Sequence, residues 1–482
     1  MVALMSSPHT QASPDARRRR GIERFALVTT TTALAVFLLF LFIAAFALAR
    51  RSDLGEERYI ELFVDVLRHV RDFYVEEEEV GTRDLVEGAL KGMIDSLDDP
   101  YSTYLTGEEM ELLEETTSGQ FGGIGVVIGE TRRGIEVSRP IRGTPAFKAG
   151  ILPGDLIVAV DGRSIVDLGL DEAVQLIRGE PLTEVGLTIR RNGNEWEATL
   201  MRAVIETNSV ERAVIDRGMG YLQILSFTMN TLQQVRDALD YLRDADYQGL
   251  ILDLRGNPGG LLDSVVEVAD LFLEKGTTVV STESRVLALN RTYRSLQEPV
   301  VSPDIPIVVL IDRYSASASE ILTGALKDHQ RALVVGETSY GKGSVQEILP
   351  KGEGGVKLTS SYYLTPSGAN INEVGIAPDV VVEVEELTEE EKESYRELVQ
   401  SSRIESFLDS NPRPDDARIR DFLRSLQAEG YSIREELIRQ YIKDEINRRN
   451  YVYPIYDLEY DTVLRQAVSL MRELMAAEAA EN

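Results

Sequence analysis

Short apolar segments alternate with helical ones between residues 220 and 338. The strand-like segments are YLQILSF, GLILDLRG, TTVVSTES, IPIVVLID and ALVVGET, with helices expected at 230–245, at 261–274 and from Ala316 onward. Apolar strands that alternate with helices are typical of a largely parallel sheet covered on both faces. The pattern therefore predicts an α/β core with a largely parallel sheet, which we place at residues 204–384.

Other regions flank this core. Short β patterns separated by Gly, Pro and Asn turns run from Gly119 to Met201 and predict a small β-rich domain at 118–203. Helical patterns are expected at 50–117, before the β-rich domain, and in the charged region at 385–482, after the α/β core. At 482 residues the chain is long enough for several such units.

Charge and composition exclude several classes of function. Acidic residues outnumber basic ones by 80 to 51, and the formal charge of -29 repels phosphate backbones, so nucleic acid is not an expected partner. The chain has no cysteine, which excludes disulfides, thiolate metal sites and cysteine nucleophiles.

One apolar segment predicts the topology. No residue from Phe25 to Ala49 is charged, and such a helix can cross a hydrocarbon core of about 30 Å. The alternative is a cleaved signal peptide, whose apolar region normally has about 7–15 residues. Because Arg17–Arg20 and Arg24 precede the segment, residues 1–24 are expected in the cytoplasm. We predict a single-pass protein of the cytoplasmic membrane whose later domains lie outside the cytoplasm, in the periplasm if the envelope has an outer membrane.

A serine-rich turn follows the strand Ile305–Asp312. Ser317 could act as a nucleophile at the start of a helix, where free backbone N–H groups can stabilise an oxyanion. The spacing Ser317 to Glu320 also fits a capping box, which would give the serine a purely structural role. His329 lies about 18 Å along the same helix, so it is too distant to be the base.

Lys342 is the candidate base. It follows the strand Ala332–Gly336 and lies between Gly341 and Gly343. Adjacent parallel strands bring their carboxyl ends to one edge of a sheet, where the serine and the lysine can meet. A lysine accepts a proton only if burial lowers its pKa from about 10.4. A phosphate-binding loop is excluded because glycine occupies the position after Lys342, where Ser or Thr is required.

Seven motifs in order resemble the carboxy-terminal processing peptidases, also called tail-specific proteases. They are DDPYSTYL at 98–105, FGGIGVVIG at 121–129, GTPAFKAGILPGDLIVAVDG at 143–162, GLILDLRGNPGGLL at 249–262, SASASEIL at 315–322, YGKGSVQ at 340–346 and YYLTPSGANINEVGIAPDVVV at 362–382. The sequence departs modestly from the family pattern at Tyr101, Phe147 and Asn370.

The resemblance implies roles for particular residues. Ser317 would be the nucleophile, Lys342 the base and Gln346 the residue that orients the lysine, with no metal or organic cofactor. The oxyanion hole would use backbone amides of Ala318 and of either Gly259 or Gly260. The β-rich domain resembles a PDZ domain, whose backbone would bind a peptide C-terminus at Gly122, Gly123, Ile124 and Gly125.

The sequence thus predicts a membrane-anchored serine endopeptidase that cleaves exported proteins near their C-termini. An inactive scaffold that binds C-termini through its PDZ domain is the alternative. Self-association is a further expectation, because Leu464, Ala467, Val468, Met471, Leu474 and Met475 form an apolar stripe on the last helix. The same stripe could instead pack on its own domain.

The topology can be tested with a reporter that is active only outside the cytoplasm. Fused after Glu56, it is expected to be active, because the arginine cluster keeps the N-terminus inside. The same reporter fused after Glu23 serves as the inactive control. An inactive reporter after Glu56 contradicts the predicted compartment.

Overall fold

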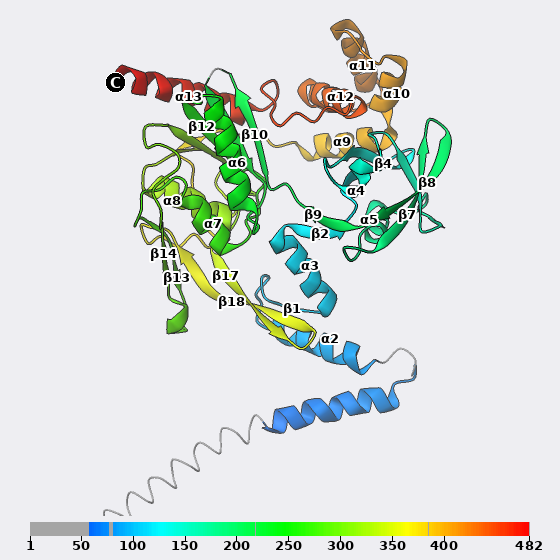
Figure 1. Ribbon diagram of the computed structural model, residues 1–482, viewed down its shortest axis with the longest axis vertical. Coiled ribbons are helices and arrows are strands. Elements are labelled where there is room, and N and C mark those ends of the chain that lie inside the picture. Colours follow the sequence, from blue (N-terminus) through cyan, green and yellow to red (C-terminus); the bar gives the residue numbers. More distant parts are fainter. Residues whose placement is uncertain (1–56, 77–80, 217, 384, 482) are drawn as a thin grey trace, which may run out of the picture. The chain divides into compact units, whose positions relative to one another are not determined.

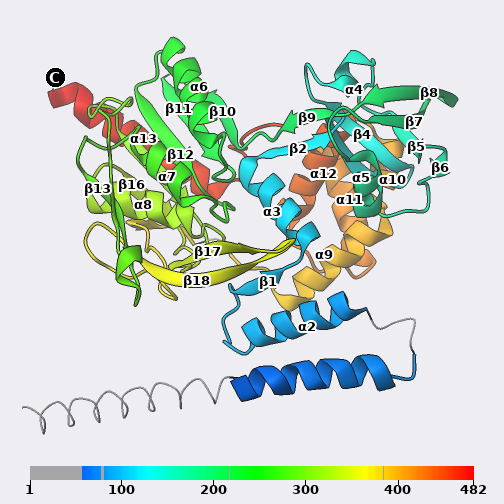
Figure 2. The same ribbon diagram turned by 60° about the horizontal axis from the view of Figure 1, so that its bottom comes forward.

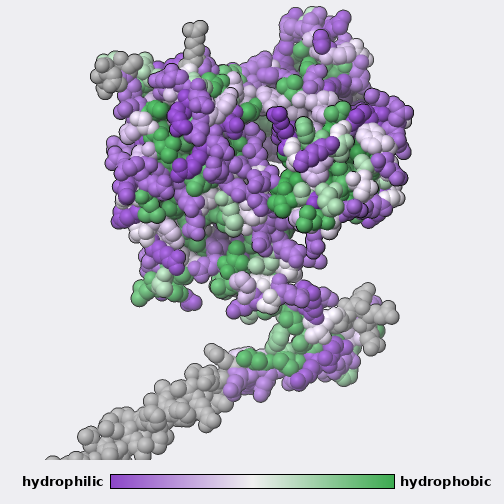
Figure 3. Space-filling model, viewed as in Figure 1, coloured by the Kyte–Doolittle hydropathy of each residue, from purple (hydrophilic) through white to green (hydrophobic). Residues whose placement is uncertain are grey.

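A computed structural model describes residues 57–76, 81–216, 218–383 and 385–481. The chain divides after Leu97 into two compact units. In the first unit, the structure describes a helix at 57–73 and α2 (Thr82–Asp95) (Figure 1). Apolar side chains of the helix 57–73 lie at the surface (Figure 3).

The predicted membrane span at 25–49 lies outside the described residues. Within the described ranges, no helix combines the length and the apolar composition needed to cross a membrane.

The second unit contains the predicted α/β core, built on a six-stranded sheet. Its strand order is β10-β11-β12-β15-β16-β19, and every neighbouring pair is parallel except β10 with β11. The strands are β10 (Val210–Ile215), β11 (Met219–Ile224), β12 (Gly249–Asp253), β15 (Ile307–Ile311), β16 (Leu333–Gly336) and β19 (Val380–Val381). The largely parallel sheet predicted from the sequence is confirmed.

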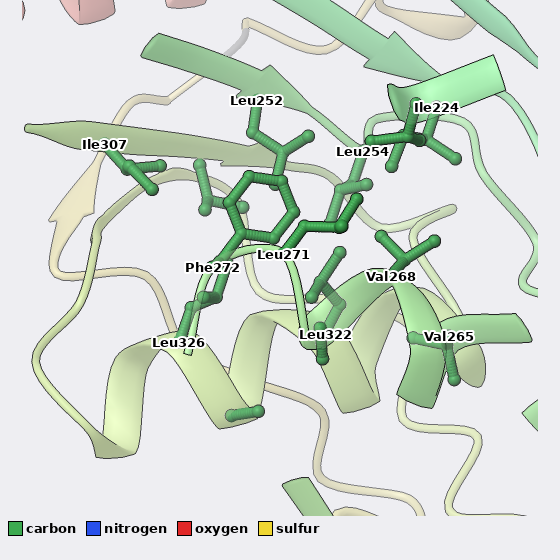
Figure 4. Close-up of a cluster of buried hydrophobic side chains, with 14 of the residues drawn as sticks. Ile224, Leu252, Leu254, Val265, Val268, Leu271, Phe272, Ile307, Leu322 and Leu326 are labelled. Carbon is green, nitrogen blue, oxygen red and sulfur yellow. The ribbon is translucent and has the colours of Figure 1, made fainter. Parts of the chain in front are cut away.

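Successive residues of these strands point to opposite faces of the sheet, and each face has its own core. Leu250 and Leu252 belong to a cluster with α6 (Thr231–Asp244), α7 (Leu262–Ala269) and α8 (Ala318–Asp328). Leu252 and Leu322 lie in this cluster with Phe272 and Leu326 (Figure 4). This face of the sheet is apolar, and the opposite face is apolar as well, which explains the nearly continuous apolar strands.

The opposite face is covered by α13 (Thr462–Glu481). Leu464, Ala467, Val468 and Met471 are buried there against strand residues such as Ile251. The apolar stripe that suggested self-association thus packs on its own domain, as the alternative interpretation held. The reason is that the outward face of the sheet exposes an equally apolar surface, which this helix covers within the same chain.

A second, five-stranded sheet lies beside the end of this core. β17 (Ser344–Lys351) and β18 (Gly354–Leu364) form a long hairpin (Figure 2). β18 also pairs with β1 (Thr103–Leu105) and with β13 (Thr278–Glu283), which in turn pairs with β14 (Thr292–Arg294). Through β1, the DDPYSTYL segment is attached to β18, the second strand of the hairpin that follows the lysine loop.

The β-rich domain is an antiparallel sheet with its own core. The strand order is β3-β4-β5-β7-β8, with the short β6 (Arg163–Ser164) beside β5. Its elements are β3 (Val126–Thr131), β4 (Gly134–Pro140), α4 (Pro145–Lys148), β5 (Leu156–Val160), α5 (Leu170–Ile177), β7 (Glu184–Arg191) and β8 (Asn194–Met201). β2 (Gln120–Gly123) pairs with β9 (Ala203–Glu206) where the chain enters and leaves the domain, and α3 (Gly107–Ser118) precedes it.

The C-terminal region is helical, as the sequence predicted. A separate apolar cluster holds together its first four helices, which are α9 (Glu389–Ser401), α10 (Arg403–Ser410), α11 (Asp416–Ala428) and α12 (Glu435–Arg449).

Candidate active site

Ser317 lies in a strained turn between β15 and α8. Its φ of 55° is in the left-handed region, which a residue with a side chain adopts at an energetic cost. The serine is the N-cap of α8 and only 7% exposed. The turn therefore holds a nearly buried hydroxyl at the N-terminus of a helix, where the helix dipole favours negative charge.

The neighbouring serines have structural partners. The Ser315 hydroxyl donates to the Leu254 carbonyl at 2.8 Å, and the Ser319 hydroxyl donates to the Asn257 carbonyl at 3.0 Å. Both side chains are fully buried. Ser317 is thus the serine of this turn whose hydroxyl donates to no backbone carbonyl of the described residues.

The Glu320 carboxylate joins the serine turn to the lysine loop. Its Oε2 accepts hydrogen bonds from the backbone N–H of Ser317 at 2.7 Å and of Lys342 at 2.9 Å. Its Oε1 accepts from the Gly341 N–H at 2.7 Å and from the Ser339 hydroxyl at 2.6 Å. A fully buried carboxylate is costly without partners, and these four donors offset that cost. Glu320 therefore does more than cap α8, because it also binds the lysine loop.

The Lys342 amine lies in a partly buried environment. Burial lowers its pKa, the nearby Lys357 lowers it further, and the carboxylates of Asp99 and Glu320 act in the opposite direction. Its Nζ lies 4.6 Å from the ring centroid of Tyr101. Within the described part of the chain, Nζ makes no hydrogen bond. The direction of the pKa shift is the one that a lysine base requires.

Gln346 is held by the β17–β18 hairpin. Its Nε2 donates to the hydroxyls of Ser344 at 2.9 Å and Thr359 at 3.2 Å. No hydrogen bond joins it to Lys342 among the residues that the structure describes. Its predicted role in orienting the lysine thus stays a prediction.

Tyr363 lies beside the serine. It belongs to the motif at 362–382, but sequence analysis assigned it no role. Burial raises the pKa of its phenol to about 12, against the opposing effect of a hydrogen bond with the Ser317 side chain. The Tyr363 N–H also donates to the Gly343 carbonyl at 2.7 Å. This buried tyrosine therefore contacts the serine through its side chain and the lysine loop through its backbone.

The glycine turn after β12 packs closely on Ser317. At Gly259, where φ is +104°, a Cβ would lie 2.8 Å from the Ser317 Cβ and 2.9 Å from the Ala318 nitrogen, so a side chain does not fit. The Gly259 N–H is already bound to the Asn257 side chain at 2.8 Å. The N–H groups of Gly260 and Ala318 have no acceptor among the described residues. These two amides are the ones available to an oxyanion.

A groove of ≈ 820 Å³ borders the predicted peptide-binding segment. Gly123, Ile124 and Gly125 line it, whereas Gly122 packs against the backbone of Gly179, whose carbonyl would lie 2.0 Å from an added Cβ. β3 pairs only with β4, so its other edge is unpaired within the sheet. Apolar side chains from β3 and α5 form part of the lining, namely Val126, Val127, Ile128, Val174 and Ile177. This geometry suits an extended peptide that adds as a strand.

His329 does not belong to this site. It is the C-cap of α8, at the end opposite Ser317, and its Nε2 is hydrogen-bonded to the Thr278 carbonyl at 2.8 Å. The expectation that it cannot serve Ser317 as a base is confirmed.

Comparison with known proteins assigns the chain to a class of enzyme. Residues 218–382 match the model of peptidase family S41, residues 136–191 match a PDZ domain, and residues 51–109 match the N-terminal domain of the activating protease CtpB.

Relatives match over most of their length. The carboxy-terminal-processing protease of Bartonella bacilliformis is 39% identical over 354 residues, which cover 71% of this chain and 79% of the relative. The carboxy-terminal processing protease CtpA of Bacillus subtilis is 36% identical over 370 residues, which cover 76% and 78%. A solved photosystem II D1 C-terminal processing protease is 30% identical, with a TM-score of 0.39 and coverage of 67% of this chain and 92% of that one.

The chain belongs to peptidase family S41. It is a C-terminal processing serine protease with a PDZ domain. The predicted enzyme is thereby confirmed over the inactive scaffold.

The Glu320 bridge can be tested by Glu320→Gln. One carboxylate oxygen becomes an NH₂ group that faces two donors, so the serine turn and the lysine loop should separate. Each lost charge-assisted bond is worth about 1.5–3 kcal/mol, and we expect kcat/KM for peptide hydrolysis to fall about 10- to 100-fold. The exposed Glu298→Gln is the control. Unchanged kcat/KM in a folded Glu320→Gln protein contradicts a bridging role.

Proposed function

We propose that Ser317 and Lys342 form the catalytic dyad of this protease. The observation that carries the proposal is the pair of hydrogen bonds from the two backbone amides to one oxygen of Glu320. Segments from the ends of two adjacent parallel strands are thereby held together, although the residues are far apart in sequence.

In this mechanism the neutral Lys342 amine accepts the proton as the Ser317 Oγ attacks the scissile carbonyl. Collapse of the tetrahedral intermediate breaks the peptide bond, and the lysine ammonium returns the proton to the leaving amine. Water then attacks the acyl-serine, Lys342 accepts a proton from it, and the proton returns to Oγ as the N-terminal fragment of the substrate leaves with its new carboxyl group. The lowered pKa of Lys342 favours the neutral amine that both attacks need.

The oxyanion of each intermediate is assigned to the N–H groups of Ala318 and Gly260. Gly260 is preferred over Gly259, because the Gly259 amide is already bound to Asn257. Both donors are backbone groups of rigid turns, so they need no reorganisation as negative charge develops.

Gln346 is proposed to orient the lysine through its amide oxygen. Its nitrogen is used by Ser344 and Thr359, whereas its oxygen has no donor within the described residues. That oxygen can accept a hydrogen bond from the Lys342 ammonium.

Substrates are proposed to be proteins with a free C-terminus, which the PDZ groove captures. The unpaired edge of β3 offers backbone groups to an extended tail, and the turn at Gly123, Ile124 and Gly125 offers amides to its carboxylate. The apolar lining favours apolar side chains near the end of the tail.

The location is proposed to be outside the cytoplasm, with a membrane anchor at residues 25–49. The support is the uncharged segment itself and the arginines that precede it. In that location the substrates are exported proteins. Association of two copies also stays a proposal. The apolar stripe on α13 no longer supports it, because the stripe packs on the sheet of its own chain.

The dyad is tested by Ser317→Ala and Lys342→Arg in the full-length protein. Both should lower kcat/KM for peptide hydrolysis about 10³-fold or more, because one lacks the nucleophile and the other has a base that stays protonated. Circular dichroism should show an unchanged fold. His329→Ala, at the far end of α8, is the matched control and should keep its activity. Near wild-type turnover by Lys342→Arg excludes the lysine as base.

Capture of the C-terminus is tested with peptides that differ only in a free or amidated C-terminus. Amidation removes the negative charge that backbone amides bind, so kcat/KM should fall about 10-fold or more. Acetylation of the N-terminus of the same peptide is the control and should have little effect. Equal cleavage of the acid and the amide contradicts recognition of the tail carboxylate.

A further inference from the structure

The Lys342 ammonium lies against an aromatic ring. Its Nζ is 4.6 Å from the ring centroid of Tyr101, and among the described residues it donates no hydrogen bond. The attraction of a cation to a ring face exists only while the lysine is protonated. The contact therefore favours the form of Lys342 that cannot act as a base.

Contacts on both sides hold Tyr101 in place. Its hydroxyl is hydrogen-bonded to Tyr340, which belongs to the lysine loop, and its N–H donates to the Asp99 carboxylate at 3.0 Å. Two residues later, Thr103 begins the strand that pairs with β18. The ring is thus fixed both to the loop that carries the lysine and to the neighbouring sheet.

Other groups near the lysine also affect its charge. The carboxylates of Asp99 and Glu320 favour the ammonium, whereas burial and Lys357 oppose it. Burial raises the pKa of the Tyr101 phenol to about 12, so the tyrosine remains neutral at the pH of an assay. The other charged groups stay in place when the ring alone is removed.

We propose that Tyr101 is a positioning residue that holds Lys342 in a protonated resting position, which the lysine leaves when it loses that proton to solvent, so that the neutral amine can accept the serine proton. The inference rests on the proposed dyad, because it assigns a resting partner to the base of that dyad. It also gives a role to a residue at which the sequence departs from the family pattern. The DDPYSTYL segment thereby acts on the lysine from a distant part of the chain.

The test is the pH dependence of kcat/KM in the full-length protein. Tyr101→Leu removes the ring and keeps an apolar side chain, so the ammonium loses its attraction. The acid limb of the profile, where the lysine loses its proton, should move to lower pH by about 0.5–1 unit. Activity on that limb, relative to the plateau, should rise about 3- to 10-fold. Tyr101→Phe, which keeps the ring and loses only the hydroxyl bond to Tyr340, should leave the limb where it is in the wild type.

The result that overturns the proposal is a Tyr101→Leu limb that coincides with the wild-type limb. A uniform loss of activity at every pH also overturns it, since that result indicates packing alone. Thermal unfolding shows whether each variant is folded, and Tyr101→Met supplies the same measurement if the leucine variant is not. The activity of Lys342→Arg distinguishes failure of the dyad from failure of the proposed role of Tyr101, because near wild-type turnover by that variant refutes the dyad itself.

Discussion

A buried carboxylate, that of Glu320, accepts hydrogen bonds from both segments that supply the candidate catalytic residues. One of its oxygens binds the backbone of Ser317 and of Lys342, and the other binds two groups of the lysine loop. A carboxylate in this position must be fully paired, because an unpaired buried charge is severely destabilising. The same pairing that stabilises the charge therefore defines the distance between the serine turn and the lysine loop.

The parallel sheet makes this bridge possible. β12, β15 and β16 are neighbours, so the glycine turn, the serine turn and the lysine loop emerge at the same edge. Asn257 links the first two, since its side chain binds the Gly259 amide and its carbonyl accepts from the Ala316 N–H. The strained backbone of Ser317 is retained because these surrounding contacts stabilise the turn in this conformation. Substrate capture is assigned to a separate domain, whose groove lies along the unpaired edge of β3.

Much of this architecture could be predicted from the sequence because it depends on local patterns. Apolar strands that alternate with helices predicted the parallel sheet, and the positions of Ser317 and Lys342 after adjacent strands predicted that they would meet. The family resemblance suggested the roles of the glycine turn and of the peptide-binding segment. The dual character of the stripe on α13 could not be resolved in the same way, because an apolar helix face has the same pattern whether it covers its own sheet or a partner.

The sequence by itself determined the class of fold, the family and the candidate serine and lysine, because strand and helix periodicity and motif order are properties of neighbouring residues. Only the tertiary structure decided what lies between and around them. In the tertiary structure, the capping residue Glu320 also links the serine turn to the lysine loop. The Gly259 amide is occupied, whereas that of Gly260 is available. Tyr101 lies against the lysine and Tyr363 against the serine. Except for the bond between Asn257 and Gly259, these contacts join residues that are well separated in the chain, so they depend on tertiary packing and not on any local pattern.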